Sequence, residues 1–167
     1  MSTERLPLGK ILARVSRSFY VSLWLLPAST RETVALAYLL ARAADTIADT
    51  RLLPVPERLA HLGALARVIA GERALAPLDR DLAALARRDD VLPEEQALLR
   101  ELPGCLSRLG ALPELDRDLV RRVLATITRG MVLDLERFPG EDASALRSLA
   151  TRDELRDYCW HVAGCVG

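Results

Sequence analysis

The sequence is poor in aromatic residues and in cysteine, and both shortages narrow the classes of protein that it can encode. Aromatic side chains make up 4% of the 167 residues. The core must therefore be built from Leu, Ala and Val, a composition that suits helices. The three cysteines, Cys105, Cys159 and Cys165, lack CxxC spacing, so neither a disulfide framework nor a zinc site is indicated.

The chain also lacks an excess of charge of either sign. It carries 23 basic and 23 acidic residues, which leaves no electrostatic case for nucleic acid or for an anionic membrane. The N-terminus has no apolar core of the kind found in signal peptides. The longest uncharged run, residues 19–30, is too short to span a bilayer and contains Pro27. We therefore expect a soluble, cytoplasmic protein of one domain, residues 1–167, with at most a peripheral membrane contact.

The sequence does contain an apolar helical stretch, residues 29–50, whose last turns carry charged residues. Ser29 and Glu32 have the spacing of a capping box, which predicts the start of a helix. The segment that follows, residues 34–41, is almost wholly apolar. Such a helix is buried nearly all round, as in the middle of a bundle. We expect the rest of the chain to be organised around it.

Three charged residues share one face near the end of this helix. Asp45 and Asp49 are four residues apart, so their side chains project together, and Arg42 lies one turn earlier. Two carboxylates on an otherwise buried helix are costly unless a cation offsets them. Mg²⁺ takes oxygen ligands of this kind and fills its other positions with water and substrate phosphates. The alternative is structural: Asp49 is a solvated carboxylate, and Arg42 forms a salt bridge with Asp45.

The rest of the sequence indicates further helices and no convincing strand. Apolar residues at helical spacing predict helices over residues 8–15, 56–71, 78–88, 93–112, 114–138 and 151–167. Pro103 and Gly104 predict a kink or break in the fourth of these helices. Thr151 and Glu154 form a capping box at the start of the last. We expect one all-α domain of seven or eight helices.

A second polar motif, SRSF, precedes the central helix. It places Arg17 between Ser16 and Ser18, beside Phe19. Arginine and hydroxyl groups donate hydrogen bonds to phosphate, so one interpretation is a phosphate-binding corner. The other is a helix junction with serine caps and a surface arginine.

The helix predicted over residues 114–138 carries two more candidates. Gly130 lies in its interior, where glycine costs about 1 kcal/mol against alanine, and this indicates close packing or room for a ligand. Asp134 follows one turn later on the same face. A salt bridge from Asp134 to Arg129 or Arg137 is the structural alternative.

The last predicted helix begins with another DxxxD pair, Asp153 and Asp157. Acidic residues are favoured in the first turns of a helix by the macrodipole, so this pair needs no metal to explain it. Further on, small residues around Gly164 let another backbone, or a bulky ligand, come close.

Four sequence blocks, in their order and spacing, resemble the squalene/phytoene synthase family, the head-to-head prenyltransferases. They are SRSF at 16–19, LARAADTIAD at 40–49, GMVLDL at 130–135 and YCWHVAGCVG at 158–167. The resemblance implies a helical bundle of the isoprenoid-synthase type around a central cavity. It also implies an enzyme that condenses two prenyl diphosphates, farnesyl or geranylgeranyl, head to head through a cyclopropyl intermediate.

The same resemblance implies roles for individual residues. Asp45 and Asp49 would bind Mg²⁺, with Mn²⁺ as a substitute, and bridge it to the substrate diphosphate. Arg42 and Tyr158 would be catalytic, the tyrosine by orienting the diphosphate or by stabilising a carbocation with its ring face. The substrate would be bound by Ser16, Arg17, Ser18, Phe19, Tyr38, Arg42, Asp134, Val162 and Gly164. NADPH would be a further cofactor if squalene is the product.

The sequence departs from the family pattern at its end. In the family, a second aspartate-rich segment follows the VAGxVG block and binds the facing metal ions, and this chain ends at Gly167 without it. We therefore expect the C-terminal helices of the fold to be missing and the chain to be an incomplete, inactive fragment. A non-catalytic helical partner or regulatory subunit of a full-length synthase is the alternative. A terpene synthase acting on a single prenyl diphosphate is a third interpretation. The product and the oligomeric state stay open.

Overall fold

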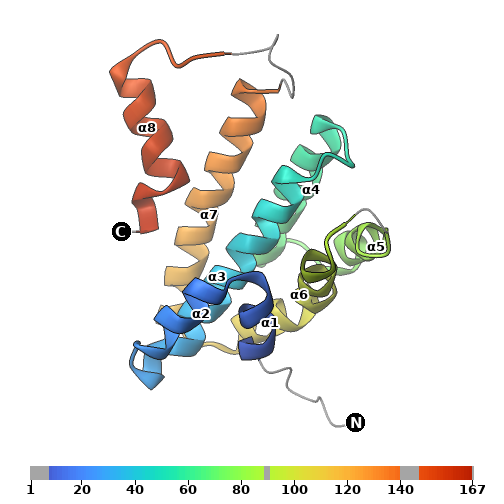
Figure 1. Cartoon of the computed structure of the whole chain (residues 1–167), viewed down its shortest axis with the longest axis vertical. Helices are drawn as coiled ribbons and strands as arrows, with labels where there is room; N and C mark the ends of the chain where they lie inside the picture. The colour runs from blue at the N-terminus through green and yellow to red at the C-terminus, as the bar shows by residue number, and fades with distance from the viewer. Residues whose placement is uncertain (1–7, 89–90, 140–146, 167) are drawn as a thin grey trace.

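The computed structural model describes residues 8–88, 91–139 and 147–166, and the all-α prediction is confirmed for these residues. They form α-helices and one short 3₁₀ helix, with no strand among them (Figure 1). The elements are α1 Leu8–Val15, α2 Arg17–Trp24, α3 Ala28–Asp49, α4 Val55–Ala70, α5 Ala76–Leu85, α6 Pro93–Ala111, α7 Glu114–Arg137, α8 Arg152–Val162 and η2 Gly164–Val166. No helix in this part of the chain is both long enough and apolar enough to cross a membrane.

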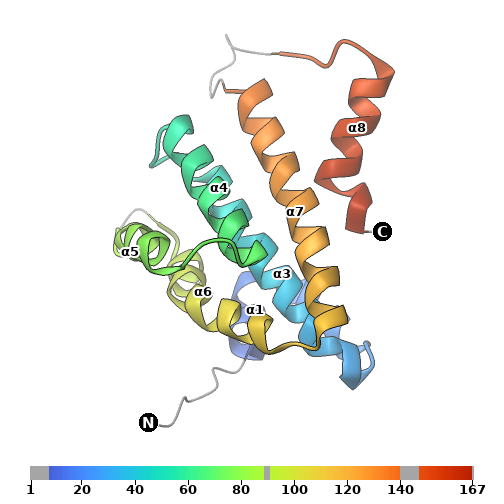
Figure 2. The same cartoon turned by 180° about the vertical axis from the view of Figure 1, so that it is seen from behind.

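The central helix of the fold is α3, as its apolar sequence predicts. It packs against α4, α6 and α7, and Figure 2 shows these three helices arranged around it. Leu36, Leu39 and Leu40 on α3 have no exposed surface, and neither do Ala43 and Ile47. Because three neighbouring helices bury most of α3, the remaining side chains of α3 project from the side that these neighbours leave uncovered.

The start of α3 differs from the prediction, because the helix begins at Ala28 and not after Ser29. Pro27 occupies the N-cap position, and no side chain caps the helix. The carbonyl of Pro27 accepts hydrogen bonds from the backbone N–H groups of Thr30 and Arg31. Because proline has a fixed φ and its carbonyl already serves the first turn, Ser29 falls inside that turn. The capping box predicted at Ser29 and Glu32 is therefore wrong.

Of the kink or break predicted at Pro103 and Gly104, the break is wrong, because α6 runs through both residues from Pro93 to Ala111. Proline in a helix interior costs about 3 kcal/mol and removes one backbone hydrogen bond. Here the helix is buried on both sides of Pro103, by Leu98, Leu99 and Leu102 before it and by Cys105 and Leu109 after it. Packing of these side chains against the core offsets the local cost.

The C-terminal helix begins as predicted and ends early. The side chain of Thr151 accepts a hydrogen bond from the backbone N–H of Glu154, at 3.2 Å. The helix ends at Val162, because Ala163 has φ −144° and leaves the helical region, and the 3₁₀ turn η2 follows. Gly167 lies outside the described residues. The prediction of one helix over 151–167 is therefore correct to Val162 only.

Leu39 provides a direct test of this core. Truncating Leu39 to Ala should lower the free energy of unfolding by about 2–5 kcal/mol, because the transfer energy is lost and a cavity remains. Leu119→Ala on α7 is the matched control, since that leucine is 46% exposed. Urea denaturation followed by circular dichroism measures both. A loss at Leu39 no larger than at Leu119 would contradict the central position of α3.

Candidate functional site

One stripe of α3 carries the side chains that its neighbours leave uncovered. Tyr38, Arg42, Asp45 and Asp49 follow one another at intervals of four, three and four residues, so they lie along one helix face. Tyr38, Arg42 and Asp45 are half-buried, and Asp49 at the end of the helix is exposed. The sequence prediction placed Arg42 and the two aspartates together on one face, and the helix bears this out.

Arg42 is held between two carboxylates. Its Nη1 forms an ion pair with Oδ2 of Asp45, and its Nη2 lies 3.7 Å from Oε1 of Glu95 on α6. The structural alternative proposed from the sequence, an Arg42–Asp45 salt bridge, is thus present. The approach of Glu95 to Arg42 was not predicted from the sequence. Glu95 lies 53 residues beyond Arg42, and the helix macrodipole alone is enough to explain an acidic residue in the first turn of α6.

Asp49 forms an acidic pair with Asp45 on α3, and the negative charge of Asp134 on α7 also acts on it. Partial burial of the carboxyl raises its pKa above the ordinary value, and the charges of Asp45 and of Asp134 on α7 raise it further. The guanidinium groups of Arg42 and Arg58 act in the opposite direction. The fold therefore brings Asp134 within electrostatic reach of the α3 pair, although 85 residues separate it from Asp49.

Arg58 is a residue that sequence reasoning missed. It is 6% exposed, and its Nη1 donates to the backbone carbonyl of Ala48 at 3.0 Å, which ties α4 to the last turn of α3 beside Asp49. The sequence did contain a signal that Arg58 is buried, because Arg58 is in helical register with Leu62 and Leu65 on the buried face of α4. This hydrogen bond restrains the backbone of the last turn of α3, which carries Asp49.

Asp134 and Tyr158 join α7 to α8. The hydroxyl of Tyr158 donates to Oδ1 of Asp134 at 2.7 Å, and the Tyr158 ring meets the Phe138 ring edge to face, with centroids 6.0 Å apart. Arg137 pairs instead with Glu154, at 4.0 Å. The contact that Asp134 makes is therefore to a tyrosine on the next helix, which local spacing could not reveal.

The hydrogen bond to Asp134, with partial burial, raises the pKa of Tyr158 to about 12. Because this exceeds the ordinary value of 10.0, the hydrogen bond stabilises the fold fully below pH 10 and progressively less as the pH rises toward 12. We expect the difference in phenolate absorbance between wild type and Tyr158→Phe to show a midpoint near 12. Asp134→Asn should bring that midpoint down. A wild-type midpoint near 10 would contradict the contact.

Gly130 marks the point of closest approach between α7 and α8. A Cβ atom at this position would lie 2.8 Å from the carbonyl oxygen of His161 and 2.9 Å from its carbonyl carbon. Real Cβ atoms do not come that close to backbone, so only glycine lets α8 dock here. Of the two interpretations of Gly130, close packing is confirmed.

The SRSF motif forms the predicted helix junction. Ser16 is the N-cap of α2, and its hydroxyl accepts a hydrogen bond from the backbone N–H of Phe19 at 3.3 Å. The Phe19 ring stacks on Tyr38 of α3, with centroids 4.0 Å apart and an interplanar angle of 17°. The side chains of Arg17 and Ser18 lie outside the described residues, so the phosphate-binding interpretation stays a prediction.

The apolar residues predicted to bind the substrate come together only in part among the described residues. Phe19 and Tyr38 are in contact beside the stripe on α3, whereas Val162 and Gly164 are exposed on α8 and η2. In this part of the chain, no three His, Cys, Asp or Glu side chains are grouped closely enough to hold a metal ion by themselves. Asp45 and Asp49 are the two carboxylates of the α3 stripe that could hold a metal ion. Such a pair suits Mg²⁺, which takes one or two protein carboxylates and completes its shell with water and phosphate.

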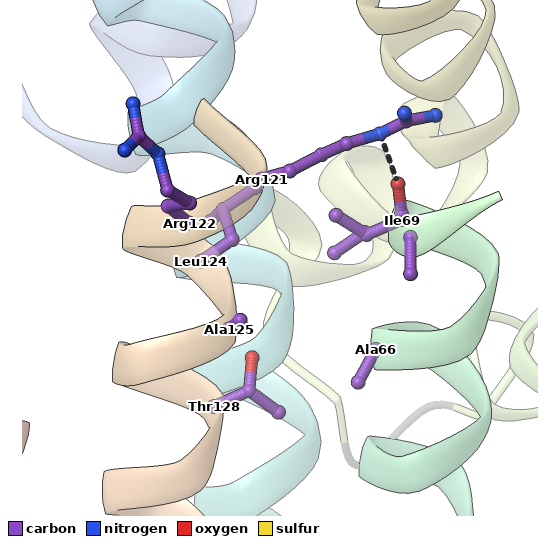
Figure 3. Close-up of a pocket in the computed structure, with 8 residues that line it drawn as sticks. Ala66, Ile69, Arg121, Arg122, Leu124, Ala125 and Thr128 are labelled. Atoms are coloured by element: carbon purple, nitrogen blue, oxygen red, sulfur yellow. Dashed lines mark hydrogen bonds between the residues drawn. The ribbon is translucent and has the colours of Figure 1, made fainter. Parts of the chain in front are cut away.

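A separate cavity of about 260 Å³ lies between α4 and α7, away from the acidic pair (Figure 3). Its walls are mainly small or apolar side chains such as Ala66, Leu124 and Ala125. Arg121 crosses its upper end in the figure and donates through Nε to the carbonyl of Ile69 at 2.9 Å. This contact caps the end of α4, so we assign the arginine a structural role.

Residues 12–167 match the family model for squalene/phytoene synthase. The chain belongs to the squalene/phytoene synthase family. It is 28% identical over 171 residues to the squalene synthase of Schizosaccharomyces pombe, a match that covers 95% of this chain and 32% of that protein. The chain thus spans about a third of the length of this curated relative.

Two solved structures of TcSQS, in complex with the ligands E5700 and BPH1237, have the same fold as this member of the family. Their TM-scores are 0.66 and 0.68, each with 24% sequence identity. Each match covers 95% of this chain and 40% of the solved chain. The helical isoprenoid-synthase type of fold expected from the resemblance is therefore confirmed.

Proposed function

We propose that this chain carries the diphosphate-binding part of a Mg²⁺-dependent prenyltransferase of the squalene/phytoene synthase type. The complete reaction would condense two prenyl diphosphates, farnesyl or geranylgeranyl, head to head through a cyclopropyl intermediate. The observation that carries this proposal is the convergence of the α3 pair, Asp45 and Asp49, with Asp134 from α7 and Tyr158 from α8.

The acidic pair fits a divalent cation better than it fits an isolated salt bridge. Arg42 neutralises Asp45, yet burial and two neighbouring carboxylates still raise the pKa of Asp49. A carboxylate destabilised by like charges gains when a cation arrives, which is typical of a binding site. Asp45 and Asp49 would hold Mg²⁺, which when bound neutralises charge on the departing diphosphate.

The other side chains would position the substrate and exclude water. Arg42, at the centre of the stripe, can turn its guanidinium from Asp45 to diphosphate oxygens. Tyr158 stays a neutral phenol at physiological pH because its pKa is about 12, and Asp134 fixes the direction of its ring. The stacked rings of Phe19 and Tyr38 would form an apolar wall that keeps water from a developing carbocation.

The second aspartate-rich segment of the family is not in the sequence given, which covers 32% of its curated relative. The complete condensation is therefore proposed for a full-length synthase of this family. A role as a helical partner of a full-length synthase is the second candidate, and one observation favours it. α8 exposes Leu155, Trp160 and Val162, an apolar surface suited to another helix. Size-exclusion chromatography with a full-length homologue tests this candidate.

Isothermal titration calorimetry with farnesyl diphosphate tests the main proposal. We expect binding in Mg²⁺ that weakens at least about tenfold when EDTA removes the metal, because the acidic pair then repels the diphosphate. Farnesol, which has the same chain without the diphosphate, is the matched ligand control and should show no dependence on Mg²⁺. Equal affinity for farnesyl diphosphate with and without metal would overturn the proposal.

A further inference from the structure

We propose that Glu95 makes the binding of a diphosphate by Arg42 depend on the metal ion. Glu95 is a positioning residue in this inference, because it acts on the ligand only through the guanidinium of Arg42. It lies on α6, outside the acidic pair of α3. The inference deepens the proposed function and rests on it, since it says how the same site makes one ligand await the other.

The first observation is that carboxylates from two helices hold the guanidinium of Arg42. Its Nη1 is paired with Oδ2 of Asp45 on α3, and its Nη2 lies 3.7 Å from Oε1 of Glu95 on α6. A guanidinium binds an oxyanion best through two parallel N–H donors. Here each terminal nitrogen already faces a carboxylate. A diphosphate that approaches Arg42 must therefore displace at least one of the two.

The second observation is the negative charge around this guanidinium. Asp45 and Glu95 are paired with it, and its charge also lowers the pKa of Asp49. Three carboxylates and one guanidinium leave a local charge of −2. Asp134 and Arg58 act on Asp49 as well, but their charges are opposite and cancel in this sum. The metal-free site therefore repels a diphosphate, and a divalent cation brings the local charge to zero.

The third observation is that the two carboxylates on Arg42 respond differently to a metal ion. Asp45 belongs to the proposed metal-binding pair, so it exchanges the guanidinium for the cation. Glu95 is not in that pair, and its side chain is 24% exposed against 36% for Asp45. Because α3 and α6 pack against each other, Glu95 stays beside Arg42 with or without metal. Nη1 is then released for a diphosphate oxygen, while Nη2 keeps its partner.

This arrangement couples the two ligands through one side chain. Without metal, a diphosphate competes with Asp45 and Glu95 for Arg42, and with metal it competes with Glu95 alone. Coupling of this kind is measured as the ratio of the two affinities, typically about 5–150-fold. Removing the charge of Glu95 leaves the metal-free guanidinium held by one carboxylate. It should then accept a diphosphate more readily before any metal has bound.

The variant Glu95→Gln tests this coupling, because glutamine keeps the length of the side chain and removes its charge. Isothermal titration calorimetry measures the affinity of the full chain for farnesyl diphosphate in Mg²⁺ and in EDTA. We expect the affinity in EDTA to rise roughly two- to fivefold, the range that corresponds to a partly exposed ion pair. In Mg²⁺ it should change less, because Nη1 of Arg42 is already released. The ratio of the two affinities should therefore fall.

Two further variants control for charge and for packing. Glu94→Gln removes the same charge from the neighbouring position of α6, whose side chain points in another direction round the helix, and it should keep the wild-type ratio. Glu95→Asp restores the charge and should restore the metal dependence. Electron paramagnetic resonance of Mn²⁺ should count one site in each variant. A variant that merely loosened α6 from α3 would lose affinity under both conditions, with no gain in EDTA.

Three results would overturn this inference and leave the proposed function standing. They are a wild-type ratio in Glu95→Gln, an equal change in Glu94→Gln, and a loss of affinity in both Mg²⁺ and EDTA. The second would assign the effect to net charge, and the third would give Glu95 a structural role. Wild-type affinity that is equal with and without Mg²⁺ is a different outcome, because it removes the proposed function and this inference together.

Discussion

Replacing Asp49 with Asn should remove most of the Mg²⁺-dependent affinity for farnesyl diphosphate. We expect a loss of at least roughly 10–100-fold, the range that loss of an outer-shell metal partner already costs. Asn keeps the size of the side chain but not its charge. The remaining carboxylate of the pair, Asp45, is already engaged in an ion pair with Arg42. Isothermal titration calorimetry at fixed Mg²⁺ measures the change.

The stability of the metal-free chain should move in the opposite direction. Folding raises the pKa of Asp49, so the ionised form that is present at neutral pH opposes folding. Asn removes that ionised group, and the variant should unfold at the same or a higher denaturant concentration than wild type. A large loss of stability would mean that Asp49 has a structural role instead.

Asp153→Asn is the matched control for this substitution. Asp153 also belongs to a DxxxD pair, removal of its charge is chemically the same, and it is exposed in the first turn of α8. We expect this variant to bind farnesyl diphosphate as wild type does. Equal losses in the two variants would show that net charge, and not a specific site, governs binding.

Replacing Gly130 with Ala should push α8 away from α7. The new Cβ would meet the carbonyl group of His161 at 2.8 Å, and backbone cannot yield as a side-chain tip does. Overpacking of this kind costs roughly 1–3 kcal/mol. Because the Tyr158–Asp134 hydrogen bond crosses the same interface, it should weaken as well. Urea denaturation and amide hydrogen exchange across α8 measure the two effects.

Gly63→Ala provides the control for Gly130. Gly63 lies inside α4, and a Cβ atom added there would have no neighbouring atom within 4 Å outside its own helix turn. Alanine there should stabilise the chain by about 0.5–1 kcal/mol through helix propensity. The two glycine substitutions are thus expected to have opposite signs. Stabilisation by both would contradict the close approach of α8.

Features that depend on local spacing were predictable from the sequence. The stripe of Arg42, Asp45 and Asp49 follows from helical periodicity, and so do the burial of α3 and the cap at Thr151. The start of α3 was mispredicted although the sequence contained the relevant residue. The pattern at Ser29 matched a capping box, but Pro27 two residues earlier already fixed the first turn.

Features that depend on packing between distant helices were not predictable. The hydrogen bond between Tyr158 and Asp134 and the approach of Glu95 to Arg42 join helices that no sequence spacing relates. The continuity of α6 through Pro103 has the same origin, because it depends on leucines that the core buries on both sides. The site therefore combines a local motif with contacts that only the fold assembles.

The central claim is that the carboxylates of Asp45 and Asp49 together bind a divalent cation, and electron paramagnetic resonance of Mn²⁺ tests it most directly. Free Mn²⁺ gives a strong signal that is lost on binding, so titration counts the sites. We predict one site in wild type and in the double variant Asp153→Asn with Asp157→Asn, and none in Asp45→Asn with Asp49→Asn. Unchanged Mn²⁺ binding in the α3 double variant would contradict the account.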